Sequence, residues 1–160
     1  MRILKSVVAV TLVVAVAQGV YGQEPSEAEQ EKARRDQLRI AVQEICPVSG
    51  QKLGSMGTPI KVEIGEQKEQ VFLCCKGCAN GKIDPKHWAT IHANIAKAQG
   101  KCPVMDKTLP ASSKWTIVEG QIVYVCCPPC TKKIEADPKA FLRKVDEFYR
   151  ASLKEKRTGQ

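Results

Sequence analysis

Eight cysteines are the residues whose type and spacing offer chemistry in this sequence of 160 residues. They form two sets of four in the same order, a Cys-Pro-Val followed downstream by Cys-Cys-x-x-Cys. The first set is Cys46, Cys74, Cys75 and Cys78, and the second is Cys102, Cys126, Cys127 and Cys130. Thiolates bind soft or borderline metal ions such as Zn²⁺ and Cu⁺, whereas metals that prefer oxygen ligands match them poorly. All eight cysteines are therefore candidate metal ligands.

A thiolate site requires sulfurs from separate stretches of chain to lie about 2.3 Å from one ion. In the first set, a Cys-Pro turn supplies Cys46, and a strand that runs into a turn or short helix supplies the later cysteines. Cys74 and Cys78 are four residues apart, so they face one point once that turn becomes helical. Cys75 points elsewhere if the strand continues, but it can rotate in as a fourth ligand. A cysteine at a helix N-terminus has a lowered pKa, which favours the thiolate that metals require.

Disulfide bonds are the first alternative, because an even number of cysteines in an exported chain is typical of a disulfide framework. The chain would then be a disulfide-stapled interaction module. The adjacent cysteines at 74–75 and 126–127 argue against this, since neighbours in sequence cannot readily bridge each other without strain. A mixed behaviour also stays open, with metal bound in the reduced state and disulfides formed on oxidation.

Thiol–disulfide exchange is the second alternative. Residues 75–78 and 127–130 both have the C-x-x-C spacing of thioredoxin-like centres. Such centres lie on a βαβ scaffold of roughly a hundred residues, about twice the length of either set here. The upstream cysteines would also have no role. We therefore favour metal binding over exchange.

Other catalytic constellations are not evident, and we expect no enzymatic activity: no Ser/His/Asp set, phosphate-binding glycine loop or paired carboxylates stand in a convincing context. His87 and His92 have no counterparts in the second set, so we interpret them as surface or packing residues rather than ligands.

The elements that must position the cysteines follow from an internal duplication. Cys-Pro-Val recurs 56 residues later, Cys-Cys-x-x-Cys recurs 52 residues later, and Asp-Pro recurs 53 residues later. Each copy predicts a hairpin that runs into its cysteine pair, with strands at 60–64 and 70–73, then 115–118 and 122–125. The expected turns are residues 65–68 and Gly120-Gln121.

A helix is expected to close each copy. Asp84 and Asp137 each precede a proline, as the N-cap and first residue of a helix do. Apolar residues then share one helical face: Trp88, Ile91 and Ile95 in the first copy, and Phe141, Val145, Phe148 and Tyr149 in the second.

A charged helical lead is expected at 23–45. Ser26 and Glu29 form an S-x-x-E capping box, and a thin apolar line runs along its last turns at Leu38, Ala41, Val42 and Ile45. We expect these last turns to dock on the first module, with a partner-binding or dimerising helix as the alternative. At the other end, residues 151–160 are expected to form a polar tail that is frayed from Lys154 onward.

The N-terminus predicts export. A basic start, an apolar run at 7–17 and small residues up to Gly22 are typical of a secretory signal peptide at 1–22. The apolar run is too short for a spanning helix of about 20 residues, so we expect a secreted or periplasmic protein without stable membrane insertion after cleavage. The formal charge of +8 is scattered among acidic residues, so we expect no nucleic-acid partner.

The order of motifs resembles the YHS/TRASH family of heavy-metal-binding domains. That resemblance covers both copies and implies two small tandem treble-clef-like modules of the α+β class, at 45–98 and 101–150. Each module would be a β-hairpin plus helix around a cysteine site. The resemblance implies Cys46, Cys74 and Cys78 as the first ligand set, and Cys102, Cys126 and Cys130 as the second. It also implies sequestration, trafficking or resistance as the role, with a metal transporter or acceptor protein as partner.

The chain departs from the family pattern in two ways: the upstream spacing is longer in the first copy than in the second, and a cysteine that could be the fourth ligand is absent. Many members carry a second cysteine three residues after the first, where this chain has Ser49 and Met105. Each site is then three-coordinate, or takes Cys75 or Cys127 as its fourth ligand. Three thiolates favour Cu⁺, whereas structural Zn²⁺ normally has four ligands. Met105 offers a soft thioether in the second copy, although we interpret it as a packing residue.

Overall fold

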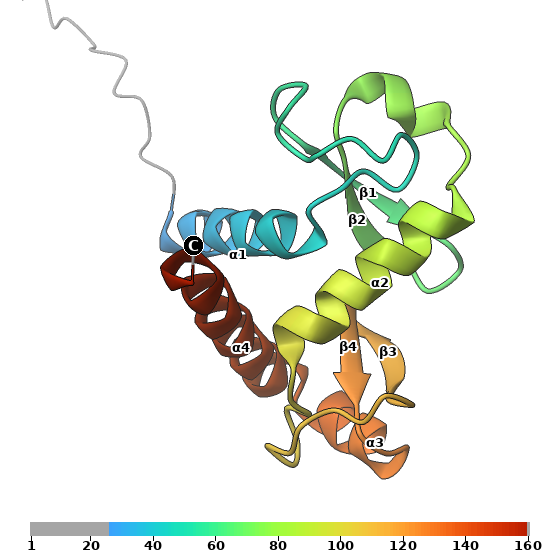
Figure 1. The fold of residues 1–160 in the computed structure, drawn as a ribbon. Coiled ribbons are helices and arrows are strands. Elements are labelled where there is room, and N and C mark those ends of the chain that lie inside the picture. Colours follow the sequence, from blue (N-terminus) through green and yellow to red (C-terminus); the bar gives the residue numbers. More distant parts are fainter. Residues whose placement is uncertain (1–25, 160) are drawn as a thin grey trace, which may run out of the picture.

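The computed structural model describes residues 26–159, so the predicted signal peptide at 1–22 lies outside the described residues. Two β-hairpins and four α-helices succeed one another, with the helical lead first (Figure 1). The elements are α1 (Glu27–Gln43), β1 (Ile60–Ile64), β2 (Glu69–Leu73), the 3₁₀ helix η1 (Lys76–Asn80), α2 (Pro85–Gln99), β3 (Lys114–Val118), β4 (Gln121–Val125), α3 (Pro129–Ala136) and α4 (Pro138–Thr158). The predicted α+β class is confirmed.

Both predicted hairpins form, each as a separate antiparallel pair of five-residue strands. The register pairs Ile60 with Leu73 in the first and Lys114 with Val125 in the second, so each hairpin delivers its cysteine pair directly after its last strand. The second turn lies one residue earlier than predicted. Glu119 and Gly120 both have positive φ, 48° and 77°, as a two-residue hairpin turn requires.

The predicted caps are present at all three helix starts. The Ser26 amide donates to the Glu29 carboxylate at 2.8 Å, and the Glu29 amide donates to the Ser26 hydroxyl at 3.4 Å. Asp84 accepts from the Lys86 amide at 2.7 Å at the start of α2. Asp137 caps α4 in the same way, accepting from the Ala140 amide at 3.2 Å.

Helix α1 packs against both modules, whereas the sequence led us to expect contact with the first module. Val42 is 2 % exposed and belongs to the core of the second module, and Leu38 packs against that core. Ile40 packs against the first core instead. The reason is α4, which the sequence pattern of α1 cannot reveal. Ion pairs between Arg35 and Asp146 and between Glu44 and Lys156 hold α1 and α4 side by side, running in the same direction.

Helix α4 continues through most of the segment predicted as a frayed tail, and that expectation is corrected. The helix continues to Thr158 because two contacts hold its last turns: Leu153 packs on the second core, and Lys156 contacts Glu44. Helix α2 runs between the two hairpins and contacts α1, α4 and β4 (Figure 1). Within residues 26–159, no helix is both long enough and apolar enough to span a bilayer.

Candidate metal centres

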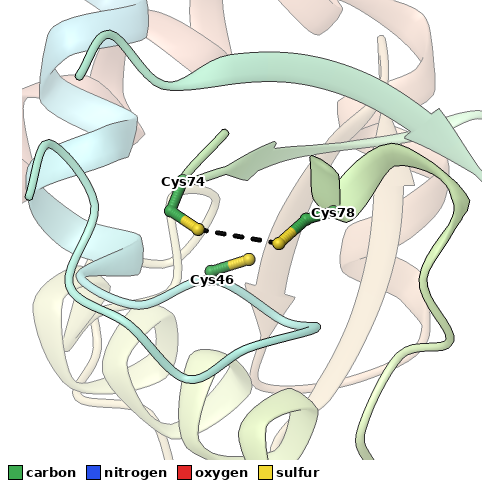
Figure 2. A group of neighbouring side chains, drawn as sticks. All are labelled: Cys46, Cys74 and Cys78. Atoms are coloured by element: carbon green, nitrogen blue, oxygen red, sulfur yellow. Dashed lines mark hydrogen bonds between the residues drawn. The ribbon is translucent and has the colours of Figure 1, made fainter. Parts of the chain in front are cut away.

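Three cysteines converge in the first module. Cys46 comes from the turn after α1, Cys74 follows the last residue of β2, and Cys78 lies on η1. Their Sγ atoms all lie within 4.8 Å of one another, and the Cys74–Cys78 distance is 3.7 Å. Figure 2 shows the three side chains pointing toward one another. We call this group the first triad.

The second module repeats this arrangement with Cys102, Cys126 and Cys130, which we call the second triad. Their Sγ atoms also lie within 4.8 Å of one another, and the Cys126–Cys130 distance is 3.8 Å. Cys102 comes from the turn after α2, Cys126 follows β4, and Cys130 lies in the first turn of α3. Duplicated elements therefore place duplicated sulfurs together.

In each triad, the separation of the two downstream sulfurs matches that of thiolates that share a metal ion. Four sulfurs at about 2.3 Å from a tetrahedral ion lie about 3.8 Å apart, close to the 3.7 Å and 3.8 Å found in the two triads. A disulfide needs about 2.05 Å, and the eight cysteines are unbridged. The geometry of the residues present thus fits a shared metal ion.

Cys75 and Cys127 lie beside the triads rather than within them. The Sγ of Cys75 is 3.9 Å from those of Cys74 and Cys78. The Sγ of Cys127 is 3.7 Å from that of Cys126 and 3.2 Å from that of Cys130. Both side chains are partly exposed. Each is therefore near enough to become a fourth ligand after a small side-chain rotation, on the solvent side of its triad.

The Cys-Pro turns stabilise a negative sulfur. The amide of Gly50 donates to the Cys46 carbonyl at 2.9 Å, and this closes the turn around the sulfur. Burial alone would raise the pKa of Cys46, but hydrogen bonds from Ser49, Cys74 and Val48 outweigh it and lower that pKa to about 6. A sulfur surrounded by amide donors is a preformed thiolate ligand.

The second turn has the same electrostatics. Burial would raise the pKa of Cys102, but the backbone amides of Cys126, Met105 and Val104 outweigh it, and the pKa of Cys102 is lowered. The amide of Asp106 donates to the Cys102 carbonyl at 2.9 Å, as Gly50 does to Cys46. The two turns are therefore equivalent in hydrogen bonding as well as in sequence.

The last cysteine of each triad, Cys78 or Cys130, resists ionisation while the triad holds no positive charge. Burial, followed by the sulfurs of Cys74, Cys46 and Cys75, raises the pKa of Cys78 to about 12. Burial and the neighbouring sulfurs raise the pKa of Cys130 as well. Three thiolates within 4.8 Å repel one another, so a cation is the partner that allows all three to ionise.

The residue three positions after the first cysteine differs between the modules. The Ser49 hydroxyl lies 3.3 Å from the Cys74 sulfur, which places an oxygen beside the first triad. Met105 is 45 % exposed at the equivalent position. Exposure of this extent does not fit the packing role expected for Met105.

The two histidines lie outside both triads, as expected. The His92 Nδ1 atom is 2.8 Å from the Tyr124 hydroxyl, which joins α2 to β4. The ring of His87 packs against Gly50, where a Cβ would lie 2.5 Å from its Nε2 atom. Both rings therefore have packing roles around the modules.

Two glutamines that the sequence reading passed over hold the cysteine strands in place. Gln43 donates to the Phe72 carbonyl at 2.7 Å and accepts from the Phe72 amide at 2.9 Å. Gln99 makes the same pair of bonds with Tyr124, at 2.7 Å and 2.9 Å. Each glutamine also donates to the carbonyl two residues later, just before the Cys-Pro turn.

This pair of bonds, which we call the glutamine clamp, ties the first cysteine of each module to the strand that carries the others. The signal was present in the sequence as Gln-x-x-Cys-Pro-Val, which occurs at 43–48 and again at 99–104. The repeated unit therefore begins before the cysteine, at the end of the preceding helix.

No protein family, characterised protein or solved structure matches this chain.

Proposed function

We propose that this chain is an exported heavy-metal-binding protein that holds one soft or borderline ion in each module through cysteine thiolates. The observation that carries the proposal is the pair of triads, each with three Sγ atoms within 4.8 Å. The duplication supports it, because the same convergence occurs twice from equivalent elements. The amide donors around Cys46 and Cys102 support it too, because they favour the ionised sulfur that binds metal.

The ion that we propose is Zn²⁺ or Cu⁺. Three thiolates alone suit Cu⁺, which accepts low coordination by soft ligands. If Cys75 and Cys127 rotate inward, each site gains the fourth thiolate that structural Zn²⁺ normally takes. Binding releases the protons that keep Cys78 and Cys130 neutral, so affinity should rise with pH.

The biological role that we propose is sequestration, trafficking or resistance outside the cytoplasm, without enzymatic activity. The signal sequence at 1–22 supports export to a secreted or periplasmic location. A metal transporter or acceptor protein would supply or receive the ion. The resemblance to heavy-metal-binding domains supports this role.

Metal stoichiometry tests the proposal. The chain from residue 23 onward, purified anaerobically and supplied with Zn²⁺ or Cu⁺, should hold about two ions per chain by elemental analysis and native mass spectrometry. Cys46→Ser and Cys102→Ser should each reduce this to about one. Ser112→Ala, at an exposed residue outside both triads, is the control and should keep both ions. Two ions retained in the Cys46→Ser/Cys102→Ser double variant would refute the proposal.

Thiol–disulfide exchange is the second candidate, and the Cys127–Cys130 pair favours it. The two sulfurs are 3.2 Å apart. Hydrogen bonds from Cys130 and Cys126 lower the pKa of Cys127, and burial raises that of Cys130. An exposed thiolate beside a buried thiol is the arrangement of a dithiol reductant. Metal-free protein that reduces insulin with dithiothreitol as electron donor, and loses this activity in Cys127→Ser, would support exchange.

A further inference from the structure

A groove of about 760 Å³ lies on the surface formed by α1 and α4. Leu38 and Ala41 of α1 and Leu153 of α4 are the apolar residues along it. Leu38 and Leu153 are partly buried and pack on the second core, so they form the floor of the groove rather than protruding from it. We call this feature the α1–α4 groove.

Five cations line the α1–α4 groove, and no carboxylate is among its lining residues. They are Arg34, Lys52, Arg150, Lys156 and Arg157, and all five are exposed. Lys156 contacts Glu44, which lies beyond the groove, and the other four have no carboxylate partner among the ion pairs of residues 26–159. The surface therefore joins an apolar floor to a strongly positive rim.

The groove follows the helices. Arg34, Leu38 and Ala41 recur at helical spacing along α1, and Arg150, Leu153 and Arg157 do so along α4. Because α1 and α4 pack against each other through the Arg35–Asp146 and Glu44–Lys156 ion pairs, these two rows form the two sides of a channel between the helices. A third helix can lie in such a channel and place one apolar face on its floor.

We infer that the α1–α4 groove binds an acidic amphipathic helix of a partner protein. The floor fits an apolar face of leucine-sized side chains, and the rim fits flanking glutamates or aspartates. A membrane surface fits less well, because its insertion needs apolar side chains that protrude, and these are recessed. A second copy of this chain also fits less well, because its formal charge is +8 and its own α1–α4 face is cationic.

The groove reaches the turn that carries Cys46. Lys52 forms a β-bridge with Ile45, the residue before Cys46, so the rim of the groove belongs to the turn that holds the first triad. A helix in the groove would therefore lie against this turn. The inference does not rest on the proposed metal function, because the groove is lined by α1, α4 and Lys52 and by none of the cysteines.

Fluorescence anisotropy with a designed peptide tests the inference. The probe is a labelled amphipathic helix with leucines on one face and glutamates on both flanks, and it is titrated with the chain from residue 23 onward. Arg34→Glu/Arg150→Glu should weaken binding at least about tenfold. The matched control is Lys132→Glu/Lys133→Glu on α3, which changes the charge equally at two exposed residues outside the groove and should leave binding unchanged.

Variants of the peptide separate shape from charge. Replacing its leucines by serine, or its glutamates by glutamine, should each abolish binding, since floor and rim both contribute. No binding of the original peptide, or equal losses in both double variants, would overturn the inference. Two further outcomes would also overturn it, both with the peptide failing to bind. The chain could bind phosphatidylserine vesicles, or it could self-associate in sedimentation, and Arg34→Glu/Arg150→Glu would remove that binding or association. Circular dichroism verifies that each variant is folded.

Discussion

The two modules share their hairpin register, their Cys-Pro turn and their glutamine clamp, but they differ in the apolar structure beneath the sulfurs. The first core cluster contains five buried residues, and two of these are Cys46 and Cys74. The second contains ten, and it extends to α1, α3 and α4. A domain with little buried apolar surface depends on a staple such as a metal. The first module should therefore need its ion for stability more than the second does.

The difference begins directly after the cysteine pair. In the first module, Gly77 and Gly81 flank Cys78, and the segment forms only the short helix η1. In the second module, Pro129 opens the longer helix α3, which carries Ile134 into the core at 0 % exposure. The Cys78 sulfur is therefore held by a short 3₁₀ helix, whereas the Cys130 sulfur is held by a longer helix whose Ile134 packs in the core.

Metal removal should produce the largest effect and show this difference. After chelation, amide exchange in β1, β2 and η1 should accelerate by at least about a hundredfold, because structural metal sites contribute many kcal/mol to small modules. The second hairpin should exchange more slowly, because its ten-residue cluster remains. Hydrogen exchange read by mass spectrometry, with the metal-loaded chain as control, measures both. Equal acceleration in the two hairpins would contradict the comparison.

The glutamine clamps should give the next largest effect, and an equal one. Gln43→Ala and Gln99→Ala each leave a buried amide and carbonyl without partners, which costs about 1–3 kcal/mol in free energy of unfolding. Urea denaturation of the metal-loaded chain measures it. Gln→Glu at either position puts a buried carboxylate against two carbonyl oxygens, and at neutral pH it should destabilise at least as much as alanine. A large effect at only one position would show that the two glutamines do not stabilise their modules equally.

The residue after each clamp should give a smaller effect of opposite sign in the two modules. Glu44 and Gly100 are central to the same tight turn, with φ of 65° and 60°, and the next amide donates to the residue before them at 2.8 Å and 2.6 Å. Glycine adopts this backbone without strain and glutamate does not. Glu44→Gly should stabilise by about 1 kcal/mol and Gly100→Ala should destabilise by about 1–2 kcal/mol in thermal unfolding. Destabilisation by Glu44→Gly would mean that its contact with Lys156 outweighs the strain.

His92 should give the smallest effect, seen only in pH dependence. Burial lowers the pKa of His92, so the unfolded chain takes up this proton first as pH falls below about 6.5. Its contribution to stability is therefore complete above that pH and declines below it. The corresponding residue of α4 is Val145, and His92→Val should flatten the slope of stability against pH between pH 7 and 5.5. An unchanged slope would assign the dependence to another group.

The features predicted from sequence are those with local signals. The hairpins were predicted because alternating apolar residues and turn glycines act within a few residues, and the strand at 60–64 forms at the predicted positions. The closeness of Cys74 and Cys78 was predicted from their spacing, whereas the family resemblance implied that Cys46 joins them. The docking of α1 on the second module and the extension of α4 were not predicted, since each depends on the other helix. The glutamine clamps depend on contacts across 29 and 25 residues.

Helix α2 has a consequence for how the molecule can be divided. Its first turn follows the Asp84 cap that completes one copy, and its last residue, Gln99, grips the strand of the next. The same helix therefore ends one copy and starts the other, so both copies share it. A fragment that begins at Gly100 would lack α2, whereas one that begins before Pro85 would retain it. Excision of the second metal centre should succeed only with α2 attached.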